Sequence, residues 1–162
     1  MEKNNAMRLL EKRGIPYQAY TFSPEIHSAQ GVAEVLGVPA AEVYKTLVVM
    51  PPDGRPLLVL VSGGCELDLH CLAHSLGLKK LRMATQKEAE TFTGLQVGGI
   101  SPLALLDRGF RVYLDRSAME LEELLLSAGQ RGKNLRLRVV DLIAVTAAQV
   151  VEATSPDPVA GG

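Results

Sequence analysis

Two strongly apolar segments on either side of a turn constrain the fold of this chain most. Residues 43–50 (VYKTLVVM) and 57–62 (LLVLVS) are rich in aliphatic and β-branched side chains, and Pro51-Pro52-Asp53-Gly54 stands between them. Aliphatic and β-branched side chains of this kind favour strands, whereas Pro, Asp and Gly favour turns. The sequence therefore predicts a β-hairpin at the centre of the domain.

Helix and further strand signals surround this hairpin. Residues 2–13 have apolar side chains toward one side, and Gly14 is a stop signal. Side chains that cap helix N-termini stand before other helical patterns, because their oxygens accept hydrogen bonds from the first free backbone amides. Further helices are expected after the caps Ser28, Asp68, Asp141 and the Thr85–Glu88 capping box. Further strands are expected at 15–22, 81–84 and 111–115.

The segment from residue 121 to 138 supports two interpretations. Leu121, Leu124 and Leu125 fit a helical period. The following residues 128–134 (AGQRGKN) instead have the composition of a hairpin tip before the strand-like run LRLRVV. From these residues alone, both interpretations stay open.

Composition limits the classes of protein that this chain can be. It has 162 residues, which suits a single domain, and a net charge of -1, which gives no overall basic field for DNA or RNA. Two cysteines make no disulfide framework, and the chain lacks both an apolar leader and a run of about 20 apolar residues. We expect a cytoplasmic protein without a membrane segment, in which RNA would bind only through a local basic patch.

Three segments are candidates for chemistry. Lys45 stands at the head of an apolar strand, where it is either partly desolvated and functional or a snorkelling edge residue. Gly98-Gly99, in VGGISP, can offer backbone N–H groups to an oxyanion or form an ordinary turn. Residues 127–134 combine two glycines and two cations, which suits phosphate or ribose but also a solvated turn.

Other kinds of site have weaker support. Cys65, His70, Cys71 and His74 have partial zinc spacing, but the histidines are expected on the solvent side of their helix and the ligand set is incomplete. We therefore expect no metal and no cofactor. The sequence also lacks the motifs of a serine or cysteine nucleophile, so catalysis would depend on positioning, backbone donors and cations.

YKTLVV, VGGISPL and SAGQRG, in this order, resemble the YbaK family of aminoacyl-tRNA deacylases, which is related to the editing domain of bacterial prolyl-tRNA synthetases. The resemblance spans nearly the whole chain and implies one domain over residues 1–154, followed by a disordered tail at 155–162. It implies an α+β fold with a curved, mostly antiparallel mixed sheet, flanking helices and an acyl site in a cleft. It also implies that residues 121–126 form a strand.

The same resemblance implies the roles of individual residues. Lys45, Gly98 and Gly99 would be catalytic. The substrate would contact Phe22, Thr46, Ser101, Ser127, Gly129, Arg131, Gly132 and Asn134. This chain departs from the family pattern at Phe22, where relatives carry tyrosine, and at Asn134, where they carry aspartate.

The function implied is trans-editing, the hydrolysis of a wrongly charged tRNA(Pro). The substrate expected first is Cys-tRNA(Pro), whose own thiol would attack its carbonyl. Ala-tRNA(Pro) is the alternative substrate, and a non-catalytic module that binds tRNA or a synthetase is the alternative class. Aminoacyl-tRNA and prolyl-tRNA synthetase are the expected partners.

Overall fold

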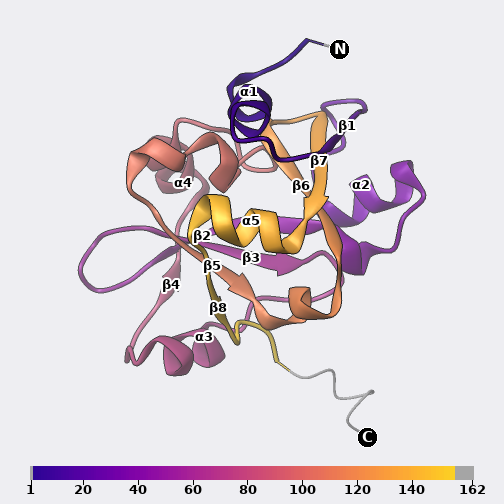
Figure 1. Ribbon diagram of the computed structural model, residues 1–162. Helices are drawn as coiled ribbons and strands as arrows, with labels where there is room; N and C mark the ends of the chain where they lie inside the picture. The colour runs from indigo at the N-terminus through magenta and orange to yellow at the C-terminus, as the bar shows by residue number, and fades with distance from the viewer. Residues whose placement is uncertain (1, 156–162) are drawn as a thin grey trace, which may run out of the picture.

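The computed structural model describes residues 2–155 and has an α+β architecture (Figure 1). The helices are α1 (Asn5–Lys12), α2 (Ala29–Leu36), α3 (Leu69–Leu76), α4 (Gln86–Thr93) and α5 (Val139–Thr146). The strands are β1 (Gln18–Thr21), β2 (Tyr44–Met50), β3 (Leu57–Ser62), β4 (Arg82–Met83), β5 (Arg111–Asp115), β6 (Glu123–Gln130), β7 (Lys133–Arg138) and β8 (Gln149–Val151). Short 3₁₀ helices lie at η1 (Ala40–Glu42), η2 (Pro102–Ala104), η3 (Leu106–Arg108) and η4 (Arg116–Glu120).

The strands form a mixed sheet of five strands and an antiparallel sheet of three. The larger sheet has the order β4-β2-β3-β5-β8, in which β5 is parallel to both of its neighbours and the remaining pairs are antiparallel. The smaller sheet has the order β1-β7-β6 and is antiparallel. An isolated bridge from Val43 to Leu125 connects the two sheets. The predicted hairpin of β2 and β3 is confirmed.

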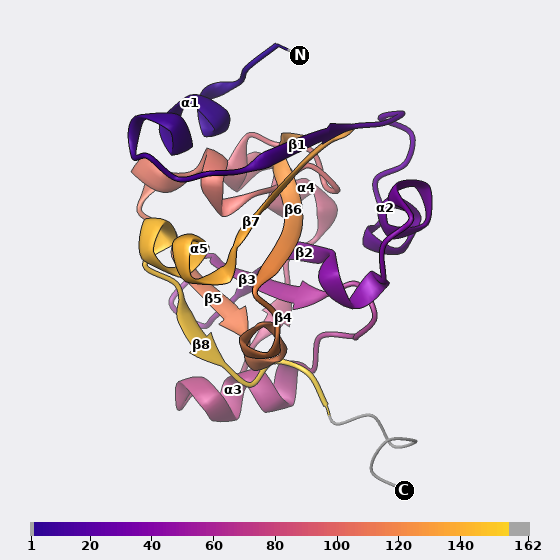
Figure 2. The same cartoon turned by 45° about the vertical axis from the view of Figure 1, so that its right-hand side comes forward.

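The main core lies between the two sheets and under α1 and α5. Leu58 and Leu60 of β3 face this core together with Leu124 and Leu126 of β6. The other face of β3 packs against α3, where Leu72 is fully buried. Figure 2 shows α3 on the side of the larger sheet away from β1 and α1. Burial on both faces explains why β3 is an unbroken apolar run.

Helix caps were predicted well, with one error. The side chains of Ser28, Asp68 and Thr85 accept hydrogen bonds from the backbone at the starts of α2, α3 and α4. Asp141 was expected to cap the last helix, but α5 begins at Val139, so Asp141 lies in its first turn. There it binds the Arg138 guanidinium at 2.9 Å instead of a backbone amide.

Residues 123–130 form strand β6, in agreement with the resemblance and against the helical period of the leucines. Leu124 and Leu126 face the core between the sheets, whereas Leu125 packs under α2. A strand buried on both faces has no polar alternation, so its leucines resemble a helical pattern. The predicted hairpin tip is confirmed, with Arg131 and Gly132 between β6 and β7.

Two further predictions concern membrane-spanning helices and the C-terminal tail. No helix among residues 2–155 is long and apolar enough to cross a membrane. Ser155, the first residue of the expected tail, is exposed, and its hydroxyl donates to the Asp68 carboxylate. The rest of that tail, residues 156–162, lies outside the described residues, so the domain boundary at 154 stays a prediction.

Candidate functional site

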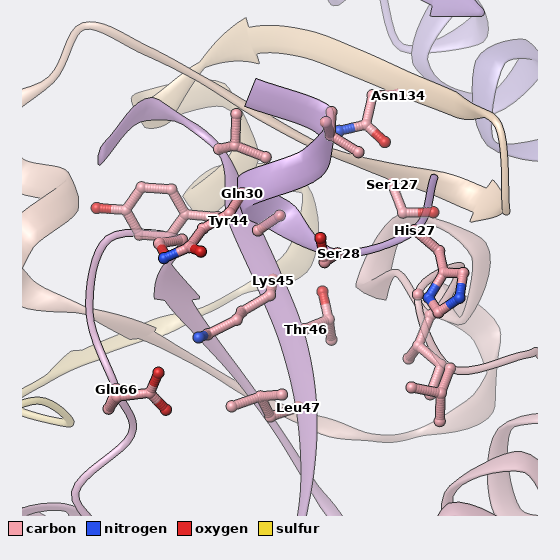
Figure 3. Close-up of a pocket in the computed structure, with 17 residues that line it drawn as sticks. His27, Ser28, Gln30, Tyr44, Lys45, Thr46, Leu47, Glu66, Ser127 and Asn134 are labelled. Carbon is pink, nitrogen blue, oxygen red and sulfur yellow. The ribbon is translucent and has the colours of Figure 1, made fainter. Parts of the chain in front are cut away.

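A pocket of about 390 Å³ opens where β2, the start of α2 and the β6–β7 hairpin meet (Figure 3). The residues that line it are His27, Ser28, Ala29, Gln30, Val32, Val43, Tyr44, Lys45, Thr46, Leu47, Gly63, Glu66, Val97, Gly98, Ile100, Ser127 and Asn134. Five of the predicted site residues are among them: Lys45, Thr46, Gly98, Ser127 and Asn134.

The pocket lies at an open edge of the larger sheet. Four consecutive residues of β2, 44–47, line it, although neighbouring side chains of a strand point to opposite faces. Within the larger sheet, β4 pairs only with Val49 and Met50, so the first half of β2 pairs with β3 alone. The site can therefore contact side chains from both faces of the sheet and the backbone edge between them.

Lys45 is half-buried, and its side chain extends toward the end of the pocket where Glu66 lies (Figure 3). Among residues 2–155, no side chain or carbonyl forms a hydrogen bond or ion pair with its ammonium group. An ammonium that is partly removed from water and lacks a protein partner remains available for a negatively charged ligand atom.

Thr46 lies on the other side of the same strand. Its Oγ1 is the buried side-chain polar atom that finds no hydrogen-bond partner among the described residues. Leaving such a hydroxyl unpaired costs about 1–3 kcal/mol. A bound polar group would remove that cost, so Thr46 favours a ligand that reaches this wall of the pocket.

The two glycines of the 97–100 loop have different surroundings. Gly98 has φ +92, and a Cβ there would lie 2.6 Å from the Cβ of His27, so only glycine fits. Gly99 donates its N–H to the Gln96 carbonyl at 2.7 Å and packs against the backbone of Gln130 and Arg131. Among residues 2–155, the Gly98 amide donates no backbone hydrogen bond, so of the two it is the one left for a developing oxyanion.

The β6–β7 hairpin supplies the opposite wall. Ser127 and Asn134 are paired across the two strands, and both are buried where they line the pocket. Arg131 lies at the tip, where its Nε donates to the Val97 carbonyl at 2.8 Å. This hydrogen bond ties the hairpin to the loop that carries Gly98.

The remaining predicted residues support the pocket from outside its lining. Phe22 packs on the apolar cluster beneath α2, and its N–H donates to the Gly132 carbonyl at 3.0 Å. Ser101 is fully buried and caps η2 by accepting from Leu103 N–H. Gly129 has φ +104 and packs against Ala104. These residues shape the walls, whereas Arg131 borders an adjoining hollow beside His27.

The sequence did not single out four polar residues of the lining: His27, Gln30, Tyr44 and Glu66. The Tyr44 hydroxyl is 2.7 Å from Ser117 Oγ, and burial raises the pKa of Tyr44 to about 12, so it is neutral at physiological pH. Glu66 lies in the segment that follows β3, which ends at Ser62. Glu66 comes near Lys45 through the pairing of β2 with β3, which no local motif encodes.

The sequence analysis considered a metal site at the cysteines and histidines in and near α3 and predicted none. His70 and His74 are exposed, and Cys71 Sγ contacts the Thr154 carbonyl at 3.8 Å. Within residues 2–155, no group of three or more His, Cys, Asp or Glu side chains is arranged to hold a metal ion.

The chain is similar to known proteins along most of its length. A family model described as "Aminoacyl-tRNA editing domain" matches residues 23–145. A relative from Enterococcus faecalis, named "Putative Cys-tRNA(Pro)/Cys-tRNA(Cys) deacylase EbsC", is 36% identical over 158 residues, which are 96% of each chain. The proline–tRNA ligase of Staphylococcus aureus is 30% identical over 113 residues, which are 70% of this chain and 19% of the ligase.

A solved structure supports the same assignment. The crystal structure of "a putative trans-editing enzyme for prolyl tRNA synthetase" has a TM-score of 0.81 and 28% identity, and the match covers 96% of this chain and all of the other. The predicted α+β fold and the predicted family are thereby confirmed. This chain belongs to the aminoacyl-tRNA editing domain family.

Proposed function

We propose that this chain is a cytoplasmic trans-editing enzyme that hydrolyses mischarged tRNA(Pro), with Cys-tRNA(Pro) as its main substrate. The relative from Enterococcus faecalis carries that substrate in its name. The observation that carries the proposal is the unpaired Lys45 ammonium in a pocket large enough for a small aminoacyl group. In this proposal, prolyl-tRNA synthetase is the partner whose errors are corrected.

The lining suits a reaction in which the substrate supplies the nucleophile. Ser28 Oγ already accepts from Gly31 N–H, and Ser127 Oγ accepts from Gly129 N–H. Among residues 2–155, neither hydroxyl is hydrogen-bonded to a histidine that could act as its base. Free thiols have a pKa of about 8.5, so the cysteinyl side chain provides some thiolate at neutral pH.

The proposed step is attack of the cysteinyl sulfur on its own ester carbonyl. The C–S bond forms, the bond from the carbonyl carbon to the ribose oxygen breaks, and that oxygen takes up a proton. Water then opens the resulting thioester to free cysteine. Lys45 Nζ and the Gly98 N–H would stabilise the oxyanion, because fixed donors aimed at the developing charge lower the barrier of acyl transfer.

Ala-tRNA(Pro) is the alternative substrate. By the family resemblance, Phe22 and Asn134 stand in place of a hydroxyl and a carboxylate, and their loss would either shift the choice of substrate or weaken the activity. Alanine has no side-chain nucleophile, so water would have to attack the ester. A module that only binds tRNA or the synthetase is the non-catalytic alternative.

One rate comparison tests the three possibilities. Cysteinyl, seryl and alanyl esters of the same tRNA(Pro) are incubated with the protein, and loss of the aminoacyl group is followed. Thiol assistance predicts that the cysteinyl ester is cleaved faster than the seryl ester by more than the roughly 100-fold that fit alone provides between near-isosteres. Fastest cleavage of the alanyl ester would refute thiol assistance, and cleavage of none would favour the binding module.

A further inference from the structure

Glu66 is the acidic side chain in the lining of the pocket. Its carboxylate lies at the same end as the Lys45 ammonium, as Figure 3 shows. Neither group forms an ion pair or a hydrogen bond with another of the described residues, and they do not pair with each other. Two opposite charges therefore face one end of the pocket without neutralising each other.

The backbone on either side of Glu66 is held in place. Leu67 forms a β-bridge with Thr154, and Asp68 N–H donates to the Ala153 carbonyl at 2.8 Å. On the other side, a Cβ at Gly63 would lie 2.8 Å from the Cβ of Ala29, so this turn is packed tightly against α2. The segment that carries Glu66 is thus anchored at both ends.

The buried Asp115 extends this anchor into the larger sheet. It is 2% exposed, and its carboxylate accepts from Ala153 N–H at 2.8 Å and from the Thr154 hydroxyl at 3.2 Å. The end of the described chain is thereby fixed to β5, and the Glu66 segment is fixed to that end. The Glu66 side chain is exposed, but it extends from a fixed backbone position beside the pocket.

We infer that Glu66 binds the α-ammonium group of the aminoacyl ester while Lys45 faces its carbonyl oxygen. This inference rests on the proposed function and names the α-ammonium group as the part of the aminoacyl ester that the enzyme recognises. Every aminoacyl ester has an α-amino group that binds a proton near neutral pH, two bonds away from the carbonyl carbon. Its positive charge and the developing oxyanion match the carboxylate and the ammonium of the pocket. An ester without a free amine, such as an N-blocked aminoacyl-tRNA, is then a poor substrate.

The test pairs a change in the protein with a change in the substrate. Wild type and Glu66→Gln are assayed on cysteinyl-tRNA(Pro) and on 3-mercaptopropionyl-tRNA(Pro), which keeps the thiol but lacks the amine. Alanyl- and propionyl-tRNA(Pro) form a second pair, so the test applies to either substrate. Glu34→Gln, an exposed glutamate on α2 outside the pocket lining, removes the same charge and is the matched control.

Glu66→Gln is expected to lower kcat/KM about tenfold or more on the esters with an amine, because hydrogen bonds to charged groups have effects of this size. On the esters without an amine, the kcat/KM of Glu66→Gln should equal that of wild type within about twofold. Equal losses on both members of a pair, or no loss on either, would overturn the inference while leaving the deacylase function intact. If wild type cleaves none of the four esters, the proposed function itself fails, and Glu66 has no aminoacyl group to bind.

Discussion

At the scale of single residues, Lys45 is the side chain on which the proposed chemistry depends most. It is half-buried in the pocket, and among the described residues its ammonium has no partner whose loss would unfold the protein. We expect Lys45→Ala to lose about 2–4 kcal/mol of transition-state stabilisation, or roughly 30- to 1000-fold in deacylation rate, with an unchanged melting temperature.

Lys87→Ala is the control for this prediction, because Lys87 is an exposed lysine of α4 outside the pocket lining. Single-turnover rates and thermal melts of the two variants are compared with wild type. A wild-type rate for Lys45→Ala would show that Lys45 is structural and would remove the central residue of the mechanism.

At the scale of elements, the start of α4 provides a pH-dependent contribution to stability. Glu88 accepts hydrogen bonds from the Arg82 guanidinium and from Thr85 N–H, and the first of these contributes most to lowering the pKa of Glu88 to about 2. An unfolded glutamate titrates at about 4.3. A lowered pKa in the folded state means that the charge stabilises α4 above this value, and that this stabilisation is lost as pH falls toward 2.

Glu88→Gln keeps a side chain that can complete the capping box but removes the charge. We expect it to lower the melting temperature near pH 7 and to converge with wild type as the pH falls from about 4 toward 2. Glu34→Gln, which removes an exposed charge from α2, should show no such trend. A difference between Glu88→Gln and wild type that stays constant down to the lowest pH at which both are folded would contradict the ionic explanation.

At the scale of the whole molecule, two local groups of basic residues are the candidates for contact with tRNA. Seven basic residues lie in two local groups of the sequence, and the structure pairs four of them with other groups: Arg82 with Glu88, Arg136 with Glu42, Arg138 with Asp141, and Lys133 with the Glu2 carbonyl. The other three, Lys79, Lys80 and Arg131, have no acidic partner among residues 2–155. The Nε of Arg131 donates to the Val97 carbonyl, but Arg131 is only partly buried, whereas Lys133 is buried. Each neutralised phosphate contributes a little less than one unit to the slope of the logarithm of the binding constant against the logarithm of the salt concentration. We therefore expect a slope of about -2 to -4 for the binding of tRNA(Pro).

Filter binding or anisotropy at several salt concentrations measures this slope. Arg131→Ala should make the slope shallower by about one unit, whereas Arg138→Ala, which removes a cation already paired with Asp141, should change it little. A slope near zero would show that the protein does not hold tRNA through its phosphates.

The sequence by itself determined the local structure and the family. Turn residues and apolar runs predicted the hairpin of β2 and β3, and the side chains of Ser28, Asp68 and Thr85 predicted helix starts, because a cap acts within three residues of itself. The order of the three motifs predicted the aminoacyl-tRNA editing family. Local signals failed at β6, where burial on both faces hides the period of a strand.

The tertiary structure alone decided how the strands divide into two sheets and which residues meet at the pocket. Lys45 and Glu66 are 21 positions apart (66 minus 45), and they face one cavity because β3 runs antiparallel to β2 and returns the chain to the start of β2. Ser127 and Asn134 join them only through the contact between the two sheets. Which residues meet at the pocket depends on pairing between distant segments, and local sequence patterns do not encode that pairing.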